Sequence, residues 1–377
     1  MRTTPDLGIA RRAYGRRDWV QQGILHIVFY ISGHGFGHAV RSVELIKALV
    51  AARPDARIIV KTSAPAWLFE TIPGSSVTLV PFLADTGITQ PDSVTIDERD
   101  SLQRAAAFYK DFEVLTGREA EFLRSNGARV VLGDTPPLAH AAAARAGVPS
   151  VAIGNFTWDW IYEGYESFRT EASGVVDVIR QAYALATLAL RLPMHGGFES
   201  MASVTVDIPF IARRSTRDPA ETRHKLGVPD DRPFVLASFG AYGLAAEFQD
   251  IARAQHLTVQ APRAQLDAGL VYPDAVAAAD LVISKPGYGI VSECVAGNTP
   301  LLFTSRGRFV EYDVFVAEMP RVLRCRFIPR DDLMAGRWRP HIDALLKQPP
   351  PPERARIDGA SVAAAEILRL VSGSPIP

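Results

Sequence analysis

The chain has few cysteines, no bias of charge and no long hydrophobic run, and each absence narrows what it can be. Its two cysteines, Cys294 and Cys325, show no metal-ligand spacing and are too few for a disulfide framework, which favours a reducing, cytoplasmic environment. Lys plus Arg equals Asp plus Glu at 41 each, so bulk charge favours neither nucleic acid nor a membrane as a partner. No stretch approaches the ~20 apolar residues that a transmembrane helix needs.

Two common nucleotide-binding patterns are also missing. The glycines from Gly33 to Gly37 follow Gly-x-Gly-x-Gly and not the Gly-x-Gly-x-x-Gly of dinucleotide-binding domains. The second predicted strand ends in Lys61-Thr62-Ser63, without the acidic residue that would hold a ribose. No Gly-Lys-Ser/Thr follows the turn, which excludes a Walker-type phosphate loop. We therefore do not expect NAD binding.

What the sequence does contain is a repeated alternation of strands and helices. An apolar fraction of 47% and a charged fraction of 22% are typical of a soluble globular protein, and 377 residues suffice for two domains of ~150–200 residues. Strand-like runs alternate with helical segments whose apolar residues recur at three- and four-residue steps, as in Ala39–Ala52. This pattern predicts an α/β fold with parallel, doubly wound sheets.

The predicted organisation has five parts. Residues 1–23 are basic and lack the apolar core of a signal peptide, so we expect a disordered leader, a start codon placed too far upstream, or a basic surface anchor. An N-terminal Rossmann-like domain covers 24–212, a charged linker 213–222, and a second Rossmann-like domain 223–348. After four prolines, residues 353–371 have the pattern of an amphipathic helix that packs across both domains.

Periodicity together with turn and loop residues predicts several further elements. We expect one long helix over Asp97–Ser125, a helix over Val175–Leu188, a helix over Leu244–Ala254, a short strand over Ala268–Val271 and a polar loop over Thr86–Thr95.

Two glycine-rich turns organise the chain. The first, Gly33-His34-Gly35-Phe36-Gly37-His38, connects a buried strand to a helix. The second, Lys285-Pro286-Gly287-Tyr288-Gly289, follows the strand Leu281–Ser284 and leads into a helix near Ile290. Such a turn directs backbone N–H groups and the positive end of a helix dipole at one point, which suits a phosphate. Two such turns predict a ligand held in a cleft between the domains.

Ionisable and aromatic side chains near these turns supply the candidate functional groups. His34 and His38 are four residues apart but have no evident third ligand, so no metal site is expected. His38 is a candidate general base because it titrates near neutral pH; a buried, hydrogen-bonded histidine is the alternative. Glu293 can accept hydrogen bonds from both ribose hydroxyls, or simply stabilise the start of its helix.

Several further candidates follow strand ends or lie in an aromatic-rich segment. The carboxylates Asp134, Asp159 and Glu311 follow strand ends, where they would meet sugar hydroxyls or solvent. Trp158, in the segment Asn155–Tyr165, has two interpretations: a stacking platform for a sugar face, or part of the core.

Two long motifs, Tyr30–Arg41 (YISGHGFGHAVR) and Asn155–Tyr162 (NFTWDWIY), carry a family resemblance. They resemble the glycosyltransferase-like N-terminal region of plant L-arabinokinases and their free-standing bacterial relatives, within the GT-B glycosyltransferases. The segments Leu190–Pro193 and Ile208–Arg214 are also similar, and the resemblance runs from about Leu25 to about Met319. It implies two facing Rossmann-like domains with a C-terminal helix that crosses between them. No sugar kinase activity is implied, because the kinase portion with its phosphate loop is absent.

The second turn is also similar to the donor-binding turn of the N-acetylglucosaminyltransferase that makes lipid II. In that family the glutamate matching Glu293 holds the donor ribose, and the histidine of the first turn matches His38. The sequence departs from that family at Glu311-Tyr312, where an acid–glutamine pair is usual, and the segment between Gly240 and Tyr272 is short.

Together these features predict a glycosyltransferase that moves a hexosyl or N-acetylhexosaminyl group from a nucleotide-diphosphate sugar, with UDP as the expected nucleotide. The partners expected are this donor and a small-molecule or glycan acceptor, with no cofactor, metal or nucleic acid. The alternatives are a non-catalytic nucleotide-sugar-binding or regulatory protein, and a nucleotide-sugar 2-epimerase. The predicted catalytic residues are His38, Asp134 and Asp159. The predicted donor-binding residues are Gly35, Gly37, Lys285, Gly287, Tyr288, Gly289, Ser292, Glu293 and Glu311. The predicted acceptor-binding residues are His34, Asn155 and Trp158.

Overall fold

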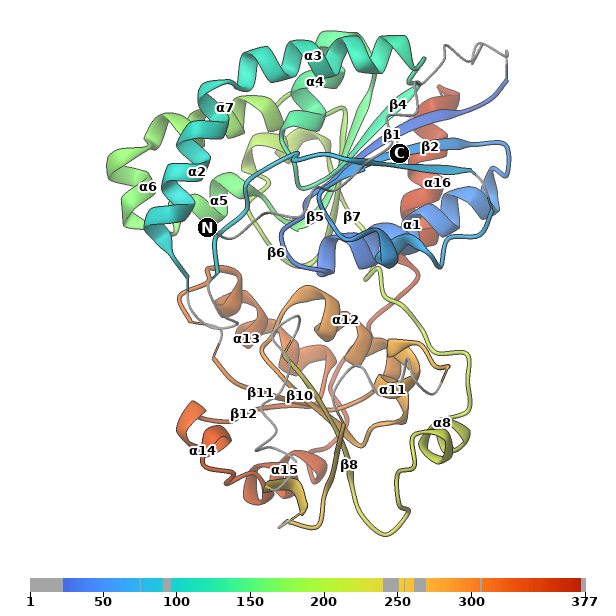
Figure 1. Cartoon of the computed structure of the whole chain (residues 1–377), viewed down its shortest axis with the longest axis vertical. Coiled ribbons are helices and arrows are strands. Elements are labelled where there is room, and N and C mark those ends of the chain that lie inside the picture. Colours follow the sequence, from blue (N-terminus) through green and yellow to red (C-terminus); the bar gives the residue numbers. More distant parts are fainter. Residues whose placement is uncertain are drawn as a thin grey trace, which may run out of the picture.

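The structure, a computed structural model, describes residues 23–74, 76–90, 96–239, 251–253, 255–260, 269–305 and 307–373. The described residues form two α/β halves, the N-terminal one drawn in blue to green above and the C-terminal one in yellow to red below (Figure 1). Almost all of the predicted leader, most of the predicted helix Leu244–Ala254 and residues 91–95 of the predicted loop lie outside the described residues.

In the described part of the N-terminal half, seven parallel strands form one sheet in the order β3-β2-β1-β4-β5-β6-β7. Helices cover both faces, so central strands such as β1 are buried throughout and read as continuous apolar runs. The order reverses between β1 and β4, and the crevice beyond the carboxyl ends of two such strands is where α/β sheets bind ligands. The strands are β1 His26–Ile31, β2 Arg57–Thr62, β3 Val77–Pro81, β4 Val130–Asp134, β5 Ser150–Phe156, β6 Leu188–Gly196 and β7 Thr205–Asp207.

The helices of this half are α1 Gly37–Ala52, η1 Ala66–Phe69, α2 Glu98–Lys110, α3 Phe112–Ser125, α4 Leu138–Ala146, α5 Trp158–Glu163, α6 Glu166–Glu171, α7 Ser173–Tyr183 and η2 Glu199–Val204. The prediction of a single helix over Asp97–Ser125 is wrong, because the chain breaks at Asp111 between α2 and α3. The break brings the rings of Tyr109 and Phe112 to 5.3 Å in one core cluster. The helix predicted over Val175–Leu188 is α7, which ends at Tyr183 because Leu188 is the first residue of β6.

The C-terminal half repeats the architecture on a smaller scale. Its described strands form a parallel sheet in the order β12-β11-β10-β8-β9, with bounds β8 Phe234–Ser238, β9 Thr258–Gln260, β10 Leu281–Ser284, β11 Leu301–Phe303 and β12 Cys325–Phe327. Its described helices include α8 Pro219–Lys225, α11 Tyr272–Ala278, α12 Tyr288–Gly297, α13 Glu311–Val322, α14 Arg330–Met334 and α15 Arg339–Leu346. Residues 269–271 are not in a strand, contrary to prediction, because Val271 is the N-cap of α11.

The chain crosses between the halves twice, and the two connecting segments touch. The outgoing segment passes through Phe210 and the returning one through residues 353–358. Phe210 N–H donates to the Arg356 carbonyl (3.1 Å), and Gly359 N–H donates to the Phe210 carbonyl (3.0 Å). The last helix, α16 Gly359–Ser372, then packs against α1 of the N-terminal half (Figure 1). This confirms the predicted fold of two Rossmann-like halves with a crossing C-terminal helix. That helix begins at Gly359, after an extended stretch, and not at 353.

None of the helices in the described ranges is both long and apolar enough to cross a lipid bilayer.

Candidate functional site

The two glycine-rich turns meet at the boundary between the halves. A Cβ added to Gly289 would lie 3.6 Å from the Cα of Gly37, and one added to Gly37 would lie 3.9 Å from the Gly289 nitrogen. The helices α1 and α12, which begin in these turns, therefore start against each other. Neither helix has a side-chain hydrogen bond at its N-cap, which is Phe36 for α1 and Gly287 for α12. Two positive helix ends thus meet without a capping side chain, which suits an anion.

The first turn is accessible. Gly33, Gly35 and Phe36 are exposed, and Gly35 has a φ of 71°, which side-chain-bearing residues rarely adopt. An added Cβ on Gly35 would meet no atom within 4 Å, so this backbone faces open space.

A buried ionic cluster follows this turn at the switch point of the sheet. The Asp134 carboxylate ends β4 directly beside β1 and lies 2.8 Å from His38 Nδ1. Arg41 Nε donates to its Oδ2 (2.8 Å) and Nη2 to its Oδ1 (2.5 Å), while Ser42 Oγ donates at 2.7 Å. Positions i, i+3 and i+4 of a helix share one face, so α1 directs His38, Arg41 and Ser42 at the same carboxylate.

The cations in this cluster keep the Asp134 carboxylate ionised. Burial would raise the pKa of Asp134, but the charge and hydrogen bonds of Arg41, together with His38, lower it to about 2. His38 Nδ1 lies 2.8 Å from Asp134 Oδ1 and 3.0 Å from Arg41 Nη2. A protonated Nδ1 donates to the ionised carboxylate and leaves a lone pair on Nε2, whereas an unprotonated Nδ1 accepts from Arg41. An imidazole held by a carboxylate in this way has the arrangement of a general base with its orienting partner.

Of the two carboxylates predicted to be catalytic, Asp134 and Asp159, only Asp134 belongs to this cluster. Asp134 has both oxygens engaged by donors, so the geometry favours it as the partner of His38. Asp159 lies in α5 at 3.5 Å from Arg180, and burial raises the pKa of its carboxyl. Within the described ranges no hydrogen bond connects Asp159 to His38.

The cluster continues into the C-terminal half through Asn155. Arg41 Nη1 donates to Asn155 Oδ1 (2.7 Å), and Asn155 Nδ2 donates to Glu311 Oε1 (2.6 Å) at the start of α13. The guanidinium of Arg41 also lies over the ring of Tyr288, 5.1 Å from its centroid. Burial would lower the pKa of Arg41, but the carboxylates of Asp134 and Glu311 and the Tyr288 hydroxyl outweigh it and raise the pKa. The structure thus joins predicted catalytic, acceptor and donor residues in one network.

Glu293, the predicted ribose ligand, already has a cationic partner. Arg213, from the segment that connects the halves, donates to Glu293 Oε1 at 2.5 Å. Burial raises the pKa of Glu293, and Arg213 acts against this shift. Among the other predicted donor residues, Ser292 Oγ donates to the Gly289 carbonyl (2.9 Å), and Lys285 is half-buried just before the turn.

Trp158 and His34, two predicted acceptor residues, lie against each other beneath the first turn. Trp158 is fully buried, with its ring edge-to-face on His34 at a centroid distance of 5.4 Å. The half-buried His34 ring in turn stacks on Phe309 of the C-terminal half at 6.1 Å. The acceptor roles of both remain predictions.

Asp85 is a site residue that the sequence did not indicate. It lies after β3, and its carboxylate accepts hydrogen bonds from Ser32 Oγ (2.9 Å) and from the Trp158 indole N–H (2.8 Å). Burial raises the pKa of Asp85 to about 6, although both hydrogen bonds and the nearby His38 oppose the shift. An acidic residue after a strand was the only available signal, and no motif surrounds it.

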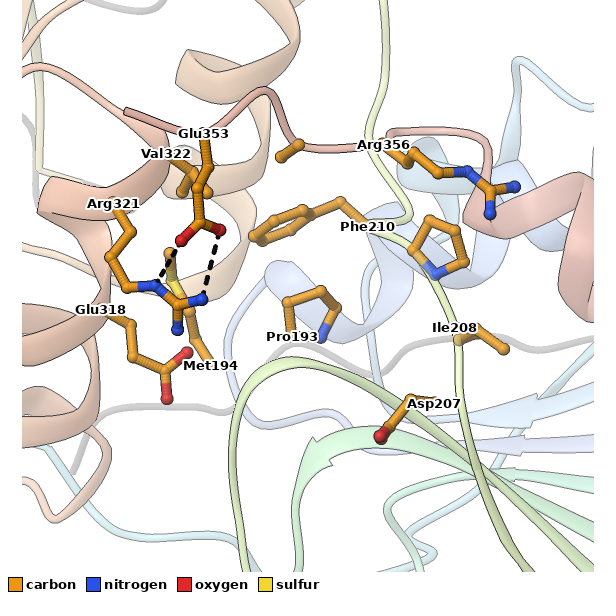
Figure 2. A pocket seen from close by; sticks show the side chains of 12 residues that line it. Pro193, Met194, Asp207, Ile208, Phe210, Glu318, Arg321, Val322, Glu353 and Arg356 are labelled. Atoms are coloured by element: carbon orange, nitrogen blue, oxygen red, sulfur yellow. Dashed lines mark hydrogen bonds and ion pairs between the residues drawn. The ribbon is translucent and has the colours of Figure 1, made fainter. Parts of the chain in front are cut away.

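A cavity of about 380 Å³ lies between the two connecting segments (Figure 2). It adjoins the network at Met194, whose carbonyl accepts from Asn155 Nδ2 at 3.5 Å. Its walls include Pro193, Phe210 and Val322, and Arg321 and Glu353 form an ion pair on it at 2.9 Å. No predicted site residue lines this cavity. Within the described residues, no group of three or more His, Cys, Asp or Glu side chains could hold a metal ion.

The architecture is shared with solved glycosyltransferases. The calicheamicin glycosyltransferase CalG4 matches 94% of this chain and 100% of its own, with a TM-score of 0.61 and 17% identity. The kitacinnamycin glycosyltransferase matches 92% of this chain and 99% of its own, with a TM-score of 0.57 and 18% identity. A proposed UDP-N-acetylglucosamine 2-epimerase of Listeria monocytogenes covers 94% and 98%, with a TM-score of 0.53 and 11% identity. The chain therefore has the GT-B fold, the architecture of the GT-B glycosyltransferase superfamily.

A relative in sequence is L-arabinokinase of Arabidopsis thaliana, which is 31% identical over 361 residues. The match covers 90% of this chain and 34% of that protein, so the chain spans about a third of the length of the curated relative. This supports the resemblance inferred from the two long motifs. No protein-family model matches the chain.

Proposed function

We propose that the chain is a glycosyltransferase that moves a hexosyl or N-acetylhexosaminyl group from a UDP-linked donor to a hydroxyl of a small-molecule or glycan acceptor. The observation that carries the proposal is the placement of His38 and Asp134 beside the contact of two uncapped helix N-termini. A base and an anion site at one point are what transfer from a nucleotide-diphosphate sugar requires.

In this mechanism His38 Nε2 removes the proton of the acceptor hydroxyl. The hydroxyl oxygen forms a bond to the anomeric carbon as the bond from that carbon to the phosphate oxygen breaks. Asp134 then stabilises the imidazolium through Nδ1–H. UDP leaves with the negative charge of the broken bond, which the amides and dipole at the start of α12 stabilise; one preorganised donor typically contributes ~3–4 kcal/mol.

Donor binding has to rearrange two contacts in this structure. The backbones of Gly37 and Gly289 approach so closely that an added Cβ would be in van der Waals contact, so a diphosphate lies beside them or the halves separate to admit it. A ribose that binds Glu293 has to compete with Arg213, 2.5 Å away. Domain opening before binding and closure after it fit both requirements and would exclude water during transfer.

A thermal-shift panel of nucleotides and nucleotide sugars tests the proposal. A ligand at 100 times its Kd stabilises the native state by about 2.7 kcal/mol. We expect UDP and at least one UDP-sugar to raise the melting temperature by several degrees, and NAD to leave it unchanged. A larger shift with NAD than with UDP would overturn the nucleotide assignment.

Turnover then separates the alternatives. With the UDP-sugar that raises the melting temperature, a transferase releases UDP only as fast as an acceptor is supplied. A 2-epimerase converts the same UDP-sugar without any acceptor. A binding protein shows the thermal shift and no conversion in either case.

A further inference from the structure

A continuous chain of buried hydrogen bonds runs from the proposed base to the C-terminal half. It passes from His38 to Asp134 (2.8 Å), to Arg41 (2.5 Å), to Asn155 (2.7 Å) and to Glu311 (2.6 Å). All five side chains are buried, and Asn155 and Asp134 have no exposed surface. The last bond is the one that crosses between the halves.

The amide of Asn155 fits this position in one orientation. Arg41 can only donate, so Oδ1 must face Arg41, and Nδ2 then donates to Glu311 Oε1 at 2.6 Å and, at 3.5 Å, to the Met194 carbonyl of the same half. The register of β5 against β6 shifts between Gly154 and Phe156, because the partners of these residues are Arg191 and Gly196, so the extra residues lie in β6 opposite Asn155.

We propose that Asn155 is a positioning residue that couples closure of the two halves to the orientation of the base. When the halves close, Glu311 accepts a hydrogen bond from Asn155 Nδ2, and Asn155 Oδ1 accepts one from Arg41. Arg41 in turn positions the Asp134 carboxylate, which orients His38. When the halves separate, the Asn155–Glu311 bond is lost, and only the longer bond to the Met194 carbonyl (3.5 Å) still holds the amide that Arg41 uses as acceptor. The inference rests on the proposed function for the role of His38 as a base.

This role differs from the acceptor contact predicted for Asn155 from the sequence. A side chain with no exposed surface, with both ends of its amide used by protein groups, has no atom left for an acceptor in the closed form. The ring of Tyr288 over Arg41 adds a second contact from the same half to the same guanidinium. The buried cluster around His38 therefore contacts the C-terminal half at two points.

A charge-exchange pair of substitutions tests the coupling. Asn155→Asp places a carboxylate against Glu311 at hydrogen-bond distance, and two like charges there repel unless they share a proton. At pH 8 we expect a larger radius of gyration in X-ray scattering, a lower melting temperature and UDP affinity reduced about 10-fold or more. At pH 5 a shared proton restores much of the wild-type behaviour.

Adding Glu311→Gln to Asn155→Asp reverses the roles in the bond between positions 155 and 311, because the side chain at 311 now donates and the one at 155 accepts. Arg41 still has a carboxylate oxygen at 155 as its acceptor. We expect the double variant to recover at least about half of each loss at pH 8. UDP lacks the sugar that is transferred, so the predicted contact of Glu311 with that sugar does not affect this probe. Asn126→Asp is the matched control, because Asn126 donates only to Phe122 O within the N-terminal half. This control should keep the wild-type radius of gyration and UDP affinity, and only its melting temperature should fall, because a carboxylate at the C-cap of α3 opposes the helix dipole.

The outcomes are distinguishable. Recovery in the double variant together with the pH reversal of the single one supports the coupling. A double variant as impaired as Asn155→Asp, or a single variant that equals the wild type at pH 8, overturns it. If UDP fails to bind the wild type, the proposed function fails, while scattering and melting still decide whether the bond between Asn155 and Glu311 holds the halves together.

Discussion

At the scale of single residues, the role of His38 depends on the groups around it. Asp134 and Arg41 both approach its Nδ1, at 2.8 and 3.0 Å, and Arg41 keeps that carboxylate ionised. The turn that precedes His38 is attached through Ser32, whose hydroxyl donates to Asp85 and accepts from His34 N–H at 3.2 Å. The site is therefore a set of mutually oriented side chains at the carboxyl ends of β1 and β4, and each of its members can be tested.

Replacing His38 should impair chemistry more than binding. His38→Ala removes the proton acceptor but leaves the two helix N-termini intact, so we expect kcat to fall by about 10²- to 10⁴-fold with UDP affinity within a few-fold of wild type. Steady-state kinetics and calorimetry on the same preparations measure both quantities. Exposed His224→Ala on α8 serves as the control. A His38→Ala enzyme with the wild-type rate would remove His38 as the base.

Asp85 should make the stability of the protein depend on pH. Its pKa is raised from 3.8 to about 6, so the native state holds this proton at pH values where the unfolded chain has lost it. Stability therefore falls as the pH rises from about 4 to about 6, by up to about 3 kcal/mol for such a shift. Asp85→Asn removes this contribution. We therefore expect the unfolding free energy of the variant, compared with that of the wild type, to fall less or to rise when the pH is raised from 4 to 7.

Denaturant titrations at the two pH values measure this difference, with Asp177→Asn on the exposed face of α7 as the control. The Ser32 and Trp158 hydrogen bonds will be weaker in Asp85→Asn at both pH values, so the comparison is the change with pH and not the absolute stability. An unchanged pH dependence would show that Asp85 ionises freely in the native protein.

The residues that sequence reasoning missed share one property. Asp85, Arg41 and Arg213 act as partners of other site residues. Arg41 and Arg213 lie in segments that carry the family resemblance, but nothing there indicated the carboxylates with which they pair. His38, Glu293 and Asp134 could be selected because they follow strand ends or glycine turns. Which cation would neutralise Glu293 was not predictable, because Arg213 reaches it from 80 positions away, out of the segment assigned as the linker.

At the scale of elements, the glycine turns were the most informative part of the sequence. A buried strand, a turn of small residues and a helix predict the β1–α1 and β10–α12 units, and the carboxyl-end rule for α/β sheets predicts where they bind ligands. Periodicity failed where tertiary packing decides. The helical pattern through Asp97–Ser125 does not show the break at Asp111, and the aromatic segment from Asn155 conceals the short helix α5.

The contact between α1 and α12 should be intolerant of a branched side chain. Gly289→Val would place its Cβ 3.6 Å from Gly37 Cα and its methyl groups in the space beside it. We expect UDP affinity to fall about 10-fold or more, because these groups cover the N–H groups at the start of α12, with a small change in melting temperature. Calorimetric titration with UDP measures the effect.

Gly117→Val on α3 is the control, because a Cβ there would meet only the flexible end of Arg145, also at 3.6 Å. If Gly289→Val bound UDP as tightly as this control, the diphosphate would not lie at the start of α12.

At the scale of the whole molecule, closure of the halves depends on contacts on both sides of the two connecting segments. On one side are the Gly37–Gly289 contact and the Asn155–Glu311 bond. On the other side the connecting segments pair with each other next to the cavity of Figure 2. A cavity there leaves room for the segments to bend, so we expect opening and closing to occur as a rotation about this pair of segments.

Gly359 is the residue at which this pairing can be tested. A Cβ on Gly359 would lie 2.1 Å from the Pro209 carbonyl oxygen and 2.7 Å from that of Phe210, so the approach of the two segments requires glycine. Gly359→Ala forces the segments apart and weakens the bond from Gly359 N–H to Phe210 O. We expect a loss of about 2 kcal/mol in unfolding free energy and a change in the radius of gyration, because α16 is displaced from α1.

Gly174→Ala near the start of α7 is the matched control, because an added Cβ there meets no atom within 4 Å. This variant should be as stable as the wild type or slightly more so, since alanine reduces the entropy of the unfolded chain. Denaturant unfolding and scattering on both variants separate a local effect of alanine from a change in the hinge. A Gly359→Ala variant with wild-type stability and scattering would mean that the connecting segments adjust freely, and that the halves are held in place by the α1–α12 side alone.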